Sequence, residues 1–292
     1  MTLKTIRTKS ISEAMQELER FAERDDEFLF RGHSNESWTI MSTLQRHTTI
    51  PHQSWDDSLD DMLAHFLVNL RSIGQLPDEI APSRRARLEY GRHHGVPSPL
   101  IDFSLSPYVA LFFAFNGVRP SNDTSKCVVV YALNIRELGQ AWAQRNGALD
   151  QNAFDEFMYE RKSLFEHGYP GDTLKYIRFP ASWNKRMQRQ RGVFVYDTLN
   201  YAQHHRRDLE DYAEKYNETP GPSTHPVLTK IYVPASEAGA AFARLEAMAI
   251  SASHLYDSSD GAAQDVVNSY NYNRKTGYAW DLKLPPPDEK KM

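Results

Sequence analysis

The segment of the chain that is most informative about the fold is residues 93–115, HHGVPSPLIDFSLSPYVALFFAF. Two prolines near its start prevent a continuous helix there. The apolar residues 100–103 predict a strand, and Ser106 followed by Pro107 is the pattern of a capped helix start. The helix predicted over residues 107–116 is apolar nearly all round, so we expect it to be central and buried.

The rest of the chain alternates between helical and strand patterns. Helices are predicted over residues 11–24, 56–72, 82–93, 138–166, 200–216 and 237–249. Strands are predicted over residues 28–30, 127–133, 192–196 and 228–234, with a loop and one short strand over 168–185. Their order is irregular, and several strands border loops rather than crossover helices. We therefore expect an α+β fold: a single domain with a mixed, mainly antiparallel sheet flanked by helices.

Composition excludes several classes of protein. Cys127 is the only cysteine, so no intrachain disulfide can form, and a cysteine-rich metal site is ruled out. The net charge of −4 argues against a general electrostatic grip on DNA. No apolar run resembles a signal segment or is long enough to span a bilayer. We expect a soluble cytoplasmic protein that binds neither membrane nor metal.

Three further segments carry a recognisable pattern. Phe30-Arg31-Gly32 ends the first predicted strand of the domain, and the other two segments are residues 184–194 and 245–261. Together with residues 93–104, and in the right order, they resemble the motifs of the FRG-domain family, which is named after the tripeptide Phe-Arg-Gly. The resemblance covers roughly residues 27–268.

The resemblance implies a layout for the chain. An FRG-like α+β domain spans residues 27–272, after an N-terminal helix within residues 1–26 that packs on the core. A polar C-terminal tail follows over residues 273–292. Four positions depart from the family pattern: Arg92 stands for glutamine, Pro99 for arginine, Phe103 for tryptophan and Asp257 for proline.

The same positions resemble, more remotely, the core of the ADP-ribosyltransferase superfamily. In that superfamily an arginine or histidine ends a first strand, a serine or threonine turn ends a second, and a third carries glutamate or glutamine. Arg31-Gly32, Asp102-Phe103-Ser104 and Gln190 fill these three places. This second resemblance implies a split sheet, NAD as substrate, and an ADP-ribosyltransferase or NAD glycohydrolase activity.

The residue types suit those roles. A guanidinium such as that of Arg31 is a planar, bidentate partner for a diphosphate. Cleavage of the nicotinamide–ribose bond builds positive charge on the ribose, which a carboxylate stabilises. Asp102 is the best-placed carboxylate, and Glu160 is a second candidate. Gln190 can hydrogen-bond a ribose hydroxyl but cannot act as a base. The residues expected to contact the cofactor are Arg31, Gly32, His94, Ser98 and Ser104.

Structural alternatives remain open for these residues. Arg31 can pair with Asp102 inside the sheet, because a buried arginine needs such a partner. His93 and His94 can cap a helix C-terminus, where positive charge is favourable. Ser104 can serve as a helix cap, and Gln190 can satisfy backbone groups at a strand edge.

Two functional hypotheses follow. The first is an NAD-dependent effector, a bacterial toxin or anti-phage defence protein, that modifies a protein or nucleic acid acceptor. An antitoxin or a phage component would be a further partner. The second is a non-catalytic module that senses a nucleotide or a phage component. No nucleophile–base–acid set with recognisable spacing supports a hydrolase triad.

Overall fold

The computed structural model describes residues 3–23, 28–46, 55–78, 80, 83–118, 125–138, 174–177, 185–197, 208–215 and 226–272. The strands are β1 (Leu3–Arg7), β2 (Phe28–His33), β3 (Leu100–Ser104), β4 (Cys127–Asn134), β5 (Leu174–Ile177), β6 (Gly192–Asp197) and β7 (Leu228–Pro234). The helices are α1 (Ile11–Ala22), α2 (Thr43–Arg46), α3 (Trp55–Ser72), α4 (Arg84–His93), α5 (Pro107–Phe115), α8 (Lys185–Arg189), α9 (Leu209–Lys215), the 3-10 helix η4 (Ala235–Glu237), α10 (Ala238–Ala247), α11 (Ala252–Tyr256) and α12 (Ser259–Asn271).

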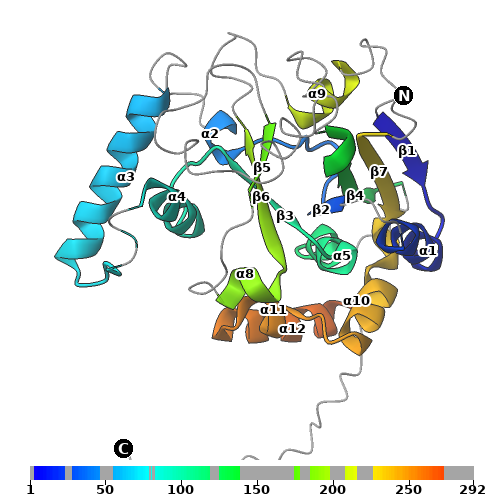
Figure 1. Ribbon diagram of the computed structural model, residues 1–292. Coiled ribbons are helices and arrows are strands. Elements are labelled where there is room, and N and C mark those ends of the chain that lie inside the picture. The colour runs from blue at the N-terminus through cyan, green and yellow to red at the C-terminus, as the bar shows by residue number, and fades with distance from the viewer. Residues whose placement is uncertain are drawn as a thin grey trace, which may run out of the picture.

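The strands form one seven-stranded sheet in the order β1-β7-β4-β2-β3-β6-β5 (Figure 1). β1 runs parallel to β7, and every other neighbouring pair is antiparallel. Helices flank this sheet. The expected α+β fold with a mixed, mainly antiparallel sheet is therefore confirmed.

The sheet is nearly divided between β2 and β3. These two strands are paired only where Phe30 faces Ser104, whereas β2 pairs with β4 from Phe28 to His33. If the two strands stayed side by side beyond this pair, Gly32 would face Asp102, but these two residues are not paired. We call this place the β2–β3 opening, because backbone groups that a continuous sheet would use are left available there.

Hydrophobic clusters cover both faces of the sheet. On one face, β2, β4 and β7 pack against α1, α5 and α10, with Phe30 and Val130 in the contact. The same face of β3 and β6 packs against α3, α4 and α8 through Leu100 and Phe194. The opposite face carries a third cluster around Tyr131, covered by α9. Figure 1 shows α3 and α4 on the side of β3 and β6, apart from α1 and α10.

The central helix α5 begins as its sequence predicts. The Ser106 hydroxyl accepts from the backbone N–H of Val109, and proline occupies the first helical position. α5 lies against β2 because Gly32 has no side chain. A Cβ at Gly32 would lie 2.0 Å from the carbonyl oxygen of Ala110 and 2.4 Å from the backbone nitrogen of Ala114. β2 continues to His33, so the expected strand end at Arg31-Gly32 is wrong.

Some strands and helices of the structure are not among those predicted from the sequence. β1 is one, because its side chains are largely exposed and no apolar run marks it. The short helix α8 is another, because five polar and apolar residues give little periodicity. The helix predicted over residues 138–166 lies, apart from its first residue, outside the described residues, as do Glu160 and the tail over 273–292. Within the described part of the chain, no helix is long and apolar enough to cross a bilayer.

Candidate functional site

A cavity of about 860 Å³ lies at the β2–β3 opening. We call it the central cavity. Its wall is formed by β2 and the segment after it, by α2, α4, β3 and α5, and by α8 with the start of β6. Arg31, Asp102 and Gln190, the three residues expected to act together in catalysis, all line it.

The central cavity is lined from both faces of the sheet. Successive side chains of a strand point to opposite faces, so Arg31 and His33 point away from the face on which Phe30 packs. Ser104 is paired with Phe30, so Ser104 and Asp102, two residues earlier, share the face of Phe30. Arg31 and Asp102 nevertheless line one cavity. The cavity therefore extends through the β2–β3 opening.

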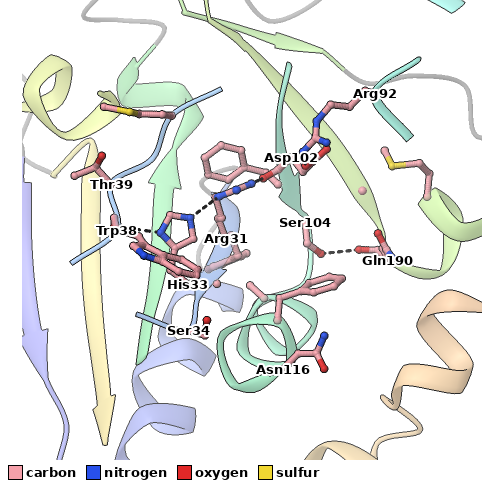
Figure 2. A pocket seen from close by; sticks show the side chains of 18 of the residues that line it. Arg31, His33, Ser34, Trp38, Thr39, Arg92, Asp102, Ser104, Asn116 and Gln190 are labelled. Carbon is pink, nitrogen blue, oxygen red and sulfur yellow. Dashed lines mark hydrogen bonds and ion pairs between the residues drawn. The ribbon is translucent and has the colours of Figure 1, made fainter. Parts of the chain in front are cut away.

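Arg31 bridges this opening. Its Nη1 donates to the backbone carbonyl oxygen of Asp102 at 2.6 Å, and its Nε donates to Nε2 of His33 at 2.8 Å (Figure 2). The hydrogen bonds that described residues make with this guanidinium use Nη1 and Nε, and none of them uses Nη2. Burial lowers the pKa of Arg31, the Asp102 carboxylate opposes this, and the cations of Arg92 and Arg46 lower it further.

His33 holds the Arg31 guanidinium in place. An arginine Nε can only donate, so Nε2 of His33 accepts and the imidazole proton sits on Nδ1. Nδ1 lies 3.2 Å from the carbonyl oxygen of Trp38 and donates to it. Burial and the charge of Arg31 lower the pKa of His33 to about 4, against the weaker effect of the Trp38 carbonyl. The ring is therefore neutral at physiological pH.

The Asp102 carboxylate binds Arg92. Nη2 of Arg92 and Oδ2 of Asp102 form an ion pair, with side chains 21% and 44% exposed. The expected pairing of Arg31 with Asp102 needs correction, because Arg31 bonds the Asp102 main chain and leaves the carboxylate to Arg92. The main-chain bond is favoured because β2 and β3 diverge here and leave that carbonyl without a strand partner.

Positive charge dominates the described lining of the cavity. Four arginines, Arg31, Arg46, Arg92 and Arg186, stand against one carboxylate, that of Asp102. Guanidinium groups bind phosphate oxygens in a bidentate, charge-assisted manner. The arrangement therefore favours an anionic ligand.

Gln190 and Ser104 close the cavity on the side of β6. The Ser104 hydroxyl donates to the carbonyl oxygen of Gln190 at 2.7 Å and accepts from the backbone N–H of Ser106. The Gln190 side-chain amide donates to the carbonyl oxygen of Leu255 at 3.3 Å. Both side chains thus satisfy backbone groups, as expected in the alternative for Gln190, whereas Ser106 and not Ser104 is the N-cap of α5. Both side chains also line the cavity.

Two residues expected to contact the cofactor do not line the central cavity. His94 is exposed, is the C-cap of α4, and packs on Tyr90 with ring centroids 4.5 Å apart. Ser98 is buried, and its backbone N–H donates to Oγ1 of Thr43 at 2.9 Å. His93 lines the cavity instead, because neighbouring helical residues point in different directions. Burial lowers the pKa of His93.

Several lining residues escape a reading of the sequence. His33 could have been found from the alternation of side chains along a strand, because residues two positions apart, such as Arg31 and His33, point to the same face. Arg92 could have been found because it is one of the positions at which this sequence departs from the family pattern, with arginine in place of glutamine. Trp38 and Arg46 follow β2 in irregular sequence and carry no local signal. Within the described ranges, no three histidine, cysteine, aspartate or glutamate side chains gather as a metal site would require.

The comparisons with known proteins give one match. The family model described as FRG domain matches residues 26–123. The match contains Phe30-Arg31-Gly32 and the motif at residues 93–104, and it ends before the segment at 184–194. No curated protein and no solved structure is significantly similar to the chain. The expected family resemblance is confirmed for this part of the sequence, and the chain carries an FRG domain over residues 26–123.

Proposed function

We propose that the protein binds NAD in the central cavity and transfers its ADP-ribose to a macromolecule or to water. The observation that supports this proposal most strongly is that Arg31, Asp102 and Gln190 line one positively charged cavity. The volume of about 860 Å³ lies within the range of small-molecule sites.

Each residue has a part in this chemistry. Nη2 of Arg31, with Arg46, binds the diphosphate. The bond between the nicotinamide nitrogen and the ribose C1′ breaks, and its electron pair leaves on nicotinamide. The Asp102 carboxylate stabilises the positive charge that develops on the ribose. Gln190 hydrogen-bonds a ribose hydroxyl. An acceptor oxygen then bonds to C1′ and releases its proton to solvent.

In a cell such an activity would be that of an effector, either a toxin or an anti-phage defence protein. Consumption of NAD, or modification of a protein or nucleic acid, would stop growth. Induced expression of the wild-type chain is expected to be toxic to bacteria, and Arg31→Ala is expected to relieve that toxicity.

One observation favours the second candidate, a nucleotide-sensing module without catalysis. The Asp102 carboxylate is already neutralised by Arg92, and Gln190 cannot act as a base. A module of this kind would bind NAD through the same arginines and leave it intact.

Incubation of the purified chain with NAD labelled in its nicotinamide separates the two candidates. We expect nicotinamide release by the wild type and none by Arg31→Ala. The matched control is Arg20→Ala, which removes an exposed arginine of α1 that pairs with Glu17. Saturable binding of NAD without release would establish the sensing module, and the absence of binding would refute both candidates.

A further inference from the structure

Trp38 is an aromatic residue at the central cavity whose position is unusual. Of the phenylalanines in the wall, Phe30 and Phe103 are buried and Phe113 is partly buried against the core, whereas Trp38 is 54% exposed. A ligand that covered this indole would gain free energy from the apolar surface removed from water.

Hydrogen bonds hold both the backbone N–H and the backbone carbonyl of Trp38. Its N–H donates to the carbonyl oxygen of Asn35 at 3.2 Å. Its carbonyl accepts from Nδ1 of His33 at 3.2 Å, and the Tyr131 hydroxyl, 3.0 Å away, shares its one proton between this carbonyl and Oε1 of Glu210. The indole also packs edge-on against the His33 ring, at 6.3 Å between centroids and 71° between planes. Trp38 is thus exposed but fixed, as a preformed stacking surface must be.

One imidazole links this indole to the phosphate-binding guanidinium. His33 bonds the Trp38 carbonyl through Nδ1 and the Nε of Arg31 through Nε2. The chain of hydrogen bonds then continues from Arg31 to Asp102 (Figure 2). The chain reaches the main chain of Asp102, and the carboxylate of the same residue pairs with Arg92. The indole, the guanidinium and the carboxylate thus follow one another along the wall of the cavity, in which all three residues lie.

That order matches the order of groups in a dinucleotide. If the diphosphate lies at Arg31 and the nicotinamide ribose lies at Asp102, the adenine half of the ligand extends toward Trp38. We propose that Trp38 is the stacking platform for the adenine base, an inference that rests on the proposed binding of NAD. Arginines nearby strengthen such a site, because their cations also interact with the π-face of a base.

Calorimetric titration of four probes tests the platform: NAD, ADP, nicotinamide mononucleotide and inorganic pyrophosphate. We expect Trp38→Ala to weaken NAD and ADP roughly 10- to 100-fold, the range for loss of one stacked base. Nicotinamide mononucleotide and pyrophosphate, which have no adenine, should bind as they do to wild type. Trp38→Phe should recover most of the affinity, and Trp38→Leu should not.

The control variant is Tyr270→Ala, because Tyr270 is an aromatic residue of α12, is 88% exposed and does not line the cavity. Equal affinity of wild type and Trp38→Ala for NAD and ADP overturns the platform alone. Binding of ADP that depends on Trp38, with no binding of NAD, supports the platform and contradicts the proposed NAD function. Failure of the wild type to bind NAD and ADP overturns both.

Discussion

The guanidinium of Arg31 donates a hydrogen bond to the backbone carbonyl oxygen of Asp102 across the β2–β3 opening. The residues belong to neighbouring strands that are paired at one other position only. A side chain thus makes the contact that a backbone N–H makes in a continuous sheet. Arg31 also lines the central cavity. Arg31 therefore supports the sheet at the opening through the Asp102 main chain, and in the proposed function the same side chain also binds the ligand.

Replacement of Arg31 by lysine separates charge from geometry. Lysine keeps the positive charge but has no planar fork, so it cannot bond His33 and Asp102 together. We expect Arg31→Lys to lower the free energy of unfolding by about 1–3 kcal/mol and to weaken pyrophosphate binding roughly tenfold. Urea denaturation and calorimetry measure the two effects. Arg20→Lys is the control, and an Arg31→Lys protein with wild-type stability would contradict the bridging role.

Substitution of Asp102 by asparagine tests the catalytic step. Asparagine preserves shape but cannot stabilise positive charge on the ribose. We expect Asp102→Asn to lower kcat for nicotinamide release at least roughly 100-fold while NAD affinity is kept or improved, since a negative charge is lost. Asp60→Asn is the matched control, because Asp60 also pairs with an arginine, Arg84, but does not line the cavity. An unchanged kcat for Asp102→Asn would exclude the carboxylate from catalysis.

Much of the fold could be predicted from local sequence, because strong local signals and tertiary packing agree there. The cap at Ser106, the following proline and the apolar helix after them specify α5, and the structure has all three. The β-branched run at residues 127–133 likewise becomes the buried strand β4. β1 could not be found in this way, because an exposed edge strand is stabilised by its partner β7 and not by its own apolar residues.

The candidate site is harder to predict from the sequence than the fold is, for a physical reason. Its geometry depends on where a sheet opens, and sheet opening is a relation between strands that are distant in sequence. The motifs point to Arg31 and Asp102, but they carry no sign of the contact between these residues through a main-chain carbonyl. The motif favours His94 at the ligand, whereas His93 lines the cavity, because a motif fixes the sequence position and not the rotation of a helix.

Replacement of Gly32 by alanine tests the close packing of α5 on β2. The new Cβ would lie 2.0 Å from the carbonyl oxygen of Ala110, a backbone atom that no side-chain rotation can move. We expect thermal or urea denaturation to show a loss of about 3 kcal/mol or more. Gly239→Ala is the control, because its Cβ would meet only ordinary contacts at 3.4 Å, in α10. Its stability should be unchanged or raised by up to about 1 kcal/mol. A Gly32→Ala protein as stable as wild type would contradict the packing.

Acid should destabilise the protein through His33, which is 7% exposed. Its pKa is about 4 in the folded chain and 6.5 ordinarily, because burial and the Arg31 charge disfavour the imidazolium. Between these values the unfolded chain binds more protons than the folded chain, so stability falls as pH drops from about 6.5 to about 4, by up to about 3 kcal/mol. His33→Gln can keep both hydrogen bonds but does not titrate. In urea denaturation at pH 7 and pH 4, the stability of the wild type relative to His33→Gln should therefore fall toward pH 4, and a constant difference would contradict the assignment.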